Sequence, residues 1–284
     1  MAVVTEQKSA RTPKRGEFAD KYGPVAVVTG ASDGIGRAIA LELAAAGLDL
    51  VLVARRSDQL SALAEELREA HGIAVRHLAL DLSHADAAGR LDVETRDADI
   101  GLLIAAAGFG TSGPLLDADI GTERQMVDVN CGAVLELAHV FARRFVARGR
   151  GGLVLFGSLV GWQGTPNAAN YAATKAYVQS LAEGLRVELA PKGVDVLSVA
   201  PGPVASGFAE RAQMTMGSAT SPKVVARAVL TSLGRRATVV PGGLGMFLTY
   251  SLSMLPRRMR VRIMGNVMKG MTKHRGTRIQ TYRS

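Results

Sequence analysis

Short apolar runs alternate along this chain with longer segments in which apolar residues recur every three or four positions. The runs predict seven β-strands, at residues 24–29, 48–54, 74–80, 100–105, 152–157, 194–199 and 237–240. The periodic segments predict helices, notably at residues 35–46, 59–70, 119–148 and 168–190. This alternation, without an internal repeat, is typical of an α/β fold with a parallel sheet between two layers of helices.

The 284 residues, 48% of them hydrophobic, suffice for one large core. We expect residues 24–240 to form a single domain, preceded by a polar tail at 1–23 and followed by an extension at 241–284. The tail lacks the apolar segment of a signal peptide. In the extension, residues 242–255 are largely apolar but too few to span a bilayer as a helix. The protein is therefore expected to be cytoplasmic.

The net charge of +9 is concentrated in the C-terminal part of the chain. Residues 211–284 hold 14 Lys and Arg and no acidic residue, so residues 1–210, with 20 basic and 25 acidic residues, carry −5. Basic and apolar residues alternate from Met254 to Met264. This segment could lie on an anionic membrane, cover a substrate pocket or pack on another subunit. The scarcity of aromatic residues in the C-terminal tail, with only Tyr282 beyond Tyr250, argues against nucleic acid as a partner.

The first predicted strand runs into Thr29-Gly30-Ala31-Ser32-Asp33-Gly34-Ile35-Gly36, and a helix follows. A glycine-rich turn between a strand and a helix is typical of dinucleotide-binding proteins, because it brings backbone amides close to the pyrophosphate. The second strand then ends in Arg55 and Arg56, where an NAD-binding protein would carry a carboxylate. A guanidinium suits a 2′-phosphate, so NADP(H) is expected in preference to NAD(H), with Arg55 as its main contact.

Tyr171 and Lys175 lie four residues apart in a predicted helix, which places them on one face. An ammonium group beside a phenol favours the phenolate, so the pair could transfer a proton. Ser158 ends the preceding strand, where its hydroxyl could bind the oxygen of a carbonyl or alcohol. The five histidines and the single cysteine, Cys131, show no metal-ligand spacing, and no metal is expected.

The glycine turn, Ser158 and the Tyr-x-x-x-Lys pair together resemble the short-chain dehydrogenase/reductase family, over residues 25–240. Within the family, the motifs Tyr22-Gly23-Pro24 and Asp33-Gly34-Ile35-Gly36 resemble those of the branch that contains hydroxysteroid dehydrogenases and long-chain ketoacyl reductases. The resemblance implies a Rossmann-type doubly wound sheet of seven parallel strands. It also implies a catalytic tetrad: Ser158 holds the carbonyl oxygen, Tyr171 donates the proton, Lys175 lowers its pKa and binds the nicotinamide ribose, and Asn130 supports a water relay through its backbone.

The resemblance also implies a set of cofactor contacts. These are Gly30, Ser32, Asp33, Gly34, Ile35, Gly36, Arg55, Asp81, Leu82, Ala107, Gly108, Tyr171, Lys175, Pro201, Gly202 and Val204. The chain departs from the family at Ala105-Ala106, where relatives usually carry two asparagines, one of which ties neighbouring strands together. Some loss of stability and little loss of chemistry are expected from this change.

The predicted substrate lining is apolar, at Phe109, Val160, Trp162 and Phe208, with no Arg or Lys evident beside it. We therefore expect NADPH-dependent reduction of a bulky apolar ketone, such as a steroid or 3-ketoacyl compound, or the reverse oxidation. The alternatives are an NAD-dependent alcohol dehydrogenase and a non-catalytic NADP(H)-binding regulator with a membrane-associating tail. The resemblance implies a homodimer or homotetramer, and the basic tail leaves peripheral membrane contact open.

Overall fold

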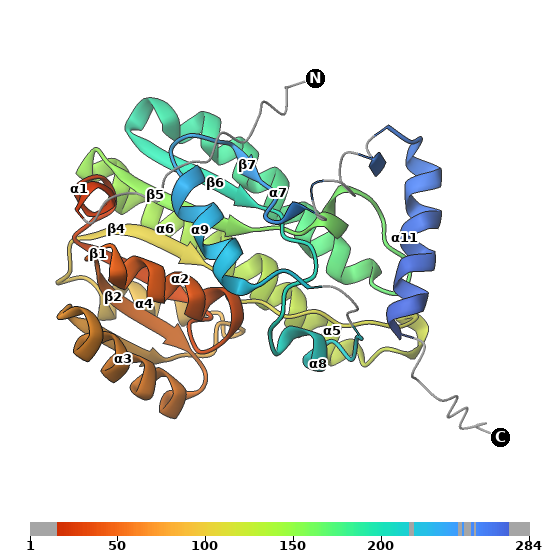
Figure 1. Ribbon diagram of the computed structural model, residues 1–284, viewed down its shortest axis with the longest axis horizontal. Helices are drawn as coiled ribbons and strands as arrows, with labels where there is room; N and C mark the ends of the chain where they lie inside the picture. Colours follow the sequence, from red (N-terminus) through yellow and green to blue (C-terminus); the bar gives the residue numbers. More distant parts are fainter. Residues whose placement is uncertain (1–15, 216–218, 244–245, 247–250, 253, 273–284) are drawn as a thin grey trace.

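The computed structural model describes residues 16–215, 219–243, 246, 251–252 and 254–272 (Figure 1). Its centre is a seven-stranded sheet in the order β3-β2-β1-β4-β5-β6-β7, in which every neighbouring pair is parallel. The strands are β1 (Val25–Thr29), β2 (Asp49–Ala54), β3 (Val75–Ala79), β4 (Ile100–Ala105), β5 (Gly151–Phe156), β6 (Val194–Val199) and β7 (Thr238–Val239). The Rossmann-type doubly wound sheet is thereby confirmed.

Helices cover both faces of the sheet, and each face has its own apolar core. On one face lie α1 (Glu17–Tyr22), α2 (Gly34–Ala45), α3 (Ser57–His71) and α9 (Pro222–Ser232), with α2 and α9 in contact (Figure 1). The other face carries α4 (Ala87–Glu94), α6 (Ala133–Arg148) and α7 (Ala169–Leu189). Because both faces are covered, strands such as β4 and β5 are buried throughout, which explains their uninterrupted apolar sequences.

Two predicted boundaries differ from the structure. Residues 17–22 lie in the predicted polar tail but form α1, because Phe18 and Tyr22 are buried in the core and the Tyr22 hydroxyl donates to Asp195 at 2.7 Å. The helix predicted over residues 119–148 is divided into α5 (Ile120–Val127) and α6 by a π-helical turn, Asp128–Gly132. Such turns are rare in helices, and those that occur are often found at functional sites.

The C-terminal extension contributes α11 (Arg257–Thr272), which lies at one end of the molecule, apart from the two helical layers (Figure 1). It packs on two loops at the carboxyl edge of the sheet. A Cβ atom on Gly265 would lie 3.1 Å from Pro166 Cγ, and the carbonyl of Met271 accepts a hydrogen bond from the amide of Thr215 at 3.0 Å. No helix within the described part of the chain is both long and apolar enough to cross a bilayer.

The remaining helical elements are short and connect these layers. They are η1 (Leu115–Asp117), η3 (Leu159–Trp162), η4 (Ala190–Lys192) and α8 (Phe208–Arg211). Two of them, η3 and α8, follow strands β5 and β6 at the carboxyl edge of the sheet, where ligands bind in folds of this kind.

Candidate active site

A cavity of about 690 Å³ opens at the carboxyl edge of the sheet. Its walls come from the glycine turn, the ends of β2, β4, β5 and β6, and helices α8 and α11. Most of the residues predicted for cofactor, catalysis or substrate line it. They are Gly30, Ser32, Asp33, Gly34, Ile35, Gly36, Arg55, Asp81, Leu82, Ala107, Gly108, Phe109, Ser158, Val160, Trp162, Tyr171, Pro201, Gly202, Val204 and Phe208. Asn130 and Lys175 are buried directly behind the wall.

The glycine turn is shaped so that only glycine fits at its critical positions. Gly30 has a φ of +67°, and a Cβ atom there would lie 2.9 Å from the backbone of Ala107. A Cβ atom on Gly36 would collide with the carbonyl oxygen of Gly30. Asp33 caps α2 by accepting from the amide of Gly34 at 2.6 Å, and it also accepts from the amide of Gly207 at 3.2 Å. The backbone is thereby held close to the N-terminus of α2, where a pyrophosphate would bind.

Two guanidinium groups lie beside this turn at the end of β2. Arg56 donates to the Ser32 hydroxyl at 3.2 Å, and Arg55 pairs with Asp81 at 4.0 Å. Burial acts to raise the pKa of Asp81, but hydrogen bonds from Ser83 and the nearby Arg55 hold that pKa below its ordinary value. The residues therefore fit a cofactor with a phosphate on the adenosine ribose, and they offer it a second cation, Arg56, in addition to the predicted Arg55.

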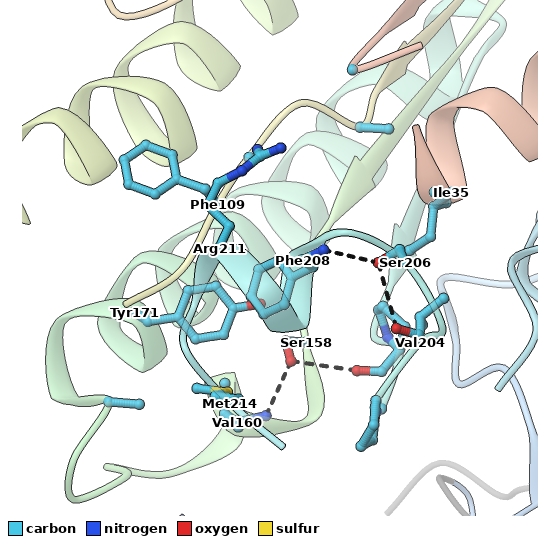
Figure 2. Close-up of a pocket in the computed structure, with 18 of the residues that line it drawn as sticks. Ile35, Phe109, Ser158, Val160, Tyr171, Val204, Ser206, Phe208, Arg211 and Met214 are labelled. Atoms are coloured by element: carbon cyan, nitrogen blue, oxygen red, sulfur yellow. Dashed lines mark hydrogen bonds between the residues drawn. The ribbon is translucent and has the colours of Figure 1, made fainter. Parts of the chain in front are cut away.

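Ser158 and Tyr171 face the same part of the cavity (Figure 2). The Ser158 hydroxyl accepts from the amide of Val160 at 3.5 Å and donates to the carbonyl of Pro201 at 3.4 Å. Both hydrogen bonds are long, so the hydroxyl is only weakly held and can turn toward a ligand. The ring of Phe208 packs on that of Tyr171 with 5.5 Å between centroids, which closes one side of the site.

The two ionisable groups of the Tyr-x-x-x-Lys pair are shifted by burial. Burial raises the pKa of Tyr171 to about 12, and the hydrogen bond with Ser158 only partly offsets the rise. Burial lowers the pKa of Lys175 to about 8. The Lys175 ammonium donates to the carbonyl of Phe156 at 3.0 Å and lies 5.8 Å from the centroid of the Tyr171 ring. Burial is thus the largest influence on the pKa of Tyr171, and the lowering of that pKa by Lys175 stays a prediction.

Asn130 lies in the π-helical turn, and its side chain is fully engaged. Its oxygen accepts from the amide of Phe109 at 3.1 Å, while its nitrogen donates to the carbonyl of Phe109 at 2.9 Å and to Thr174 at 3.1 Å. The side chain thus fixes the loop after β4 against α7. The water relay that the resemblance assigns to the Asn130 backbone stays a prediction.

A hydroxyl joins strands β1 and β4 beside the position where relatives usually carry an asparagine. Thr29, at the end of β1, accepts from the amide of Ala107 at 3.1 Å and donates to the carbonyl of Ile104 at 3.4 Å. Thr29 is buried, and these two hydrogen bonds join β1 to β4 directly beside the glycine turn. The substitution of alanine at position 106 therefore leaves the two strands tied together.

Helix α11 forms a wall of the cavity, which is one of the three roles that the sequence allows for this segment. Three turns of one helix face contribute to the lining, at Arg260, Ile263, Met264, Val267, Met268 and Met271. Their spacing of three and four residues is the signal that could have predicted this wall. The exposed residues Arg257, Arg258, Arg262 and Lys269 lie on the same helix, so membrane contact through them stays a prediction.

The expected absence of cationic side chains near the substrate is wrong. Arg211 of α8 and Arg260 of α11 both line the cavity, together with the predicted aromatic and aliphatic residues. Arg211 is exposed, whereas Arg260 is partly covered. Arg211 could not be singled out because α8 is only four residues long, and Arg260 lies in a segment with several other arginines.

Comparison with known proteins gives this geometry a family. The model of the family described as short chain dehydrogenase matches residues 24–216. The chain belongs to this family. Together with the dehydrogenase and reductase relatives described next, this match shows that the protein is an oxidoreductase that acts on CH–OH groups with NAD(P).

The chain is similar to proteins of the hydroxysteroid dehydrogenase and ketoacyl reductase branch. It is 40% identical to a 7beta-hydroxysteroid dehydrogenase of Clostridium sardiniense, over 65% of this chain and 71% of the relative. It is 34% identical to a very-long-chain 3-oxoacyl-CoA reductase of Meyerozyma guilliermondii, over 78% of this chain and 67% of the relative. A short-chain dehydrogenase from Sphingobium yanoikuyae, solved in complex with NADPH, superposes with a TM-score of 0.73 at 30% identity, over 90% and 99% of the two chains.

Proposed function

We propose that this enzyme uses NADPH to reduce a bulky apolar ketone to a secondary alcohol, or catalyses the reverse oxidation. One observation carries the proposal: a single cavity joins the hydroxyls of Ser158 and Tyr171 to the glycine turn and to an apolar wall. Two relatives named for a hydroxysteroid and for a very-long-chain 3-oxoacyl-CoA support a bulky substrate. The resemblance adds a homo-oligomeric state as a prediction, and the cytoplasmic, possibly membrane-peripheral location expected from the sequence also stays a prediction.

The preference for NADPH rests on charge at the end of β2. Arg55 and Arg56 line the cavity there, and β2 ends in Ala54 without a carboxylate beside the ribose site. A 2′-phosphate carries negative charge that the two guanidinium groups can bind through several hydrogen bonds. The solved NADPH complex of a relative supports the same choice.

NADPH, when bound, supplies the hydride that the carbonyl carbon receives. The loosely held Ser158 hydroxyl donates a hydrogen bond to the carbonyl oxygen of the substrate. Tyr171 donates its proton to the same oxygen as negative charge develops there. Because burial raises the pKa of Tyr171 to about 12, the phenol is protonated at neutral pH and is ready to act as the acid in the reductive direction.

Two buried residues support this pair from behind the cavity wall. A Cβ atom on Gly108 would lie 2.9 Å from the Asn130 side-chain oxygen and 3.5 Å from the Lys175 ammonium nitrogen. Both groups therefore lie just beneath the small residue that lines the cavity. From there Lys175 would bind the nicotinamide ribose, and Asn130 holds the loop that carries Phe109.

The Tyr171→Phe variant tests the proposal. It removes the proton donor and keeps the ring that packs on Phe208, so turnover of a steroid ketone should fall by a factor on the order of 100 or more. NADPH binding, measured by fluorescence titration, should change by less than about twofold. Tyr177→Phe is the matched control, because Tyr177 lies on the same helix, is exposed and is not part of the cavity. Full activity in Tyr171→Phe would refute the mechanism.

A further inference from the structure

The guanidinium group of Arg260 has an unusual environment for a cation on a basic surface helix. Its Nε atom is buried and has no hydrogen-bond partner among the residues that the structure describes. No ion pair joins Arg260 to a carboxylate in that part of the chain, whereas its neighbours in the lining are Ile263, Met264 and Val267. A buried polar group without a partner is destabilising, so the guanidinium of Arg260 is expected to find its partner in a bound ligand.

The carboxylates that line the cavity do not form an ion pair with Arg260. Two acidic residues line it, Asp33 and Asp81, and both belong to the cofactor side. Asp33 accepts from the amides of Gly34 and Gly207, and Asp81 accepts from Ser83. Beyond position 210 the chain contains no acidic residue. The part of the cavity formed by α8 and α11 is therefore apolar and positively charged.

The position of Arg260 also indicates the shape of the ligand. The residues of α11 that line the cavity run from Arg260 to Met271, which corresponds to about 16 Å along a helix. The Met271 end lies against Thr215, close to the segment whose Phe208 packs on Tyr171. At the other end of α11, Val261 lies near the loop that contains Gly164: a Cβ atom on Gly164 would be 4.0 Å from Val261 Cγ2. Arg260 thus stands at one end of a long apolar wall.

We propose that the substrate is an elongated apolar carbonyl compound that carries a carboxylate, and that Arg260 binds this carboxylate. Arg260 lines the cavity without an ion pair among the described residues, so its guanidinium can turn to pair with a carboxylate there, and the apolar surroundings strengthen the pairing. Arg211, which is exposed, contributes positive charge at the α8 side of the same cavity. This proposal rests on the proposed reductase function and specifies its substrate class.

The test compares a keto steroid that carries a side-chain carboxylate with its methyl ester. Binding of each is followed by quenching of Trp162, the single tryptophan of the chain, which lines the cavity and reports binding whether or not turnover occurs. We expect the full-length wild-type protein to bind the acid at least tenfold more tightly than the ester. Arg260→Met should abolish this difference by weakening the acid alone, because methionine fits among the apolar neighbours and removes the donors.

Arg262→Met is the matched control, since Arg262 is exposed on the same helix and does not line the cavity. It should keep the preference for the acid, and Arg260→Lys should keep part of it. Equal binding of acid and ester by the wild-type protein, or equal weakening of both by Arg260→Met, would overturn the proposal. Steady-state assays with the same ligands keep the two proposals apart: absence of turnover with intact acid-selective binding would refute the reductase and leave the carboxylate site standing.

Discussion

Replacement of Arg55 by alanine is the sharpest test of cofactor choice. The Arg55 side chain is 54% exposed, and its ion pair among the described residues is a 4.0 Å contact with Asp81, so the group is available to a ligand. A hydrogen bond to a charged group contributes about 1.5 to 3 kcal/mol, and solvent exposure favours the lower end of that range. A loss of about 1.5 kcal/mol weakens NADPH binding roughly tenfold. NADH, which lacks the 2′-phosphate, should bind within about twofold of its wild-type affinity.

The assay is a titration of wild-type and variant proteins with NADPH and NADH side by side, at low and at high salt. The tenfold effect should shrink at high salt because the interaction is between exposed charges. Arg56→Ala should weaken both cofactors, since Arg56 also donates to Ser32 in the glycine turn. Arg37→Ala is the control: the Arg37 side chain on α2 is 42% exposed, pairs with Glu66 and does not line the cavity. Equal loss of NADPH and NADH in Arg55→Ala would refute the assignment of Arg55 to the 2′-phosphate.

Two further predictions concern the pocket wall and pH. Met264→Trp fills the cavity beside α11, so it should raise the KM for a steroid ketone at least fivefold and leave the KM for a small cyclic ketone unchanged. Met259→Trp, on the exposed side of the same helix, should change neither KM. With a pKa of about 8, the Lys175 ammonium loses its proton as pH rises through 8, so kcat/KM for reduction should decline above that pH. A flat pH profile up to pH 10 would contradict the need for a charged Lys175.

The order of strands and helices could be predicted from the sequence because each layer leaves its own pattern. Strands such as β4 and β5 are buried on both faces and read as uninterrupted apolar runs. The end of the N-terminal tail could not be predicted in the same way. Phe18 and Tyr22 lie in a segment rich in charged residues, and their burial depends on contacts with the distant β4 and β5, which no local pattern displays.

Part of the candidate site could also be predicted from the sequence, and part could not. The residues of the glycine turn, Ser158 and Tyr171 meet in one cavity because parallel strands place their carboxyl ends at one edge of the sheet. The pKa shifts of Tyr171 and Lys175 could not be predicted from the sequence. Four-residue spacing puts Lys175 near Tyr171, but the direction of each pKa shift depends on how deeply both groups are buried.

Helix α11 shows why the C-terminal extension could be interpreted in several ways. A helix that alternates basic and apolar residues has the same sequence signature on a membrane surface and over an apolar pocket. In the structure, α11 lies over the pocket, and Gly265 allows it to approach Pro166. The helix face from Arg260 to Met271 lines the cavity, while Arg257, Arg258 and Arg262 are exposed. Lining the pocket is therefore one role of α11, and membrane contact through the exposed arginines stays a prediction.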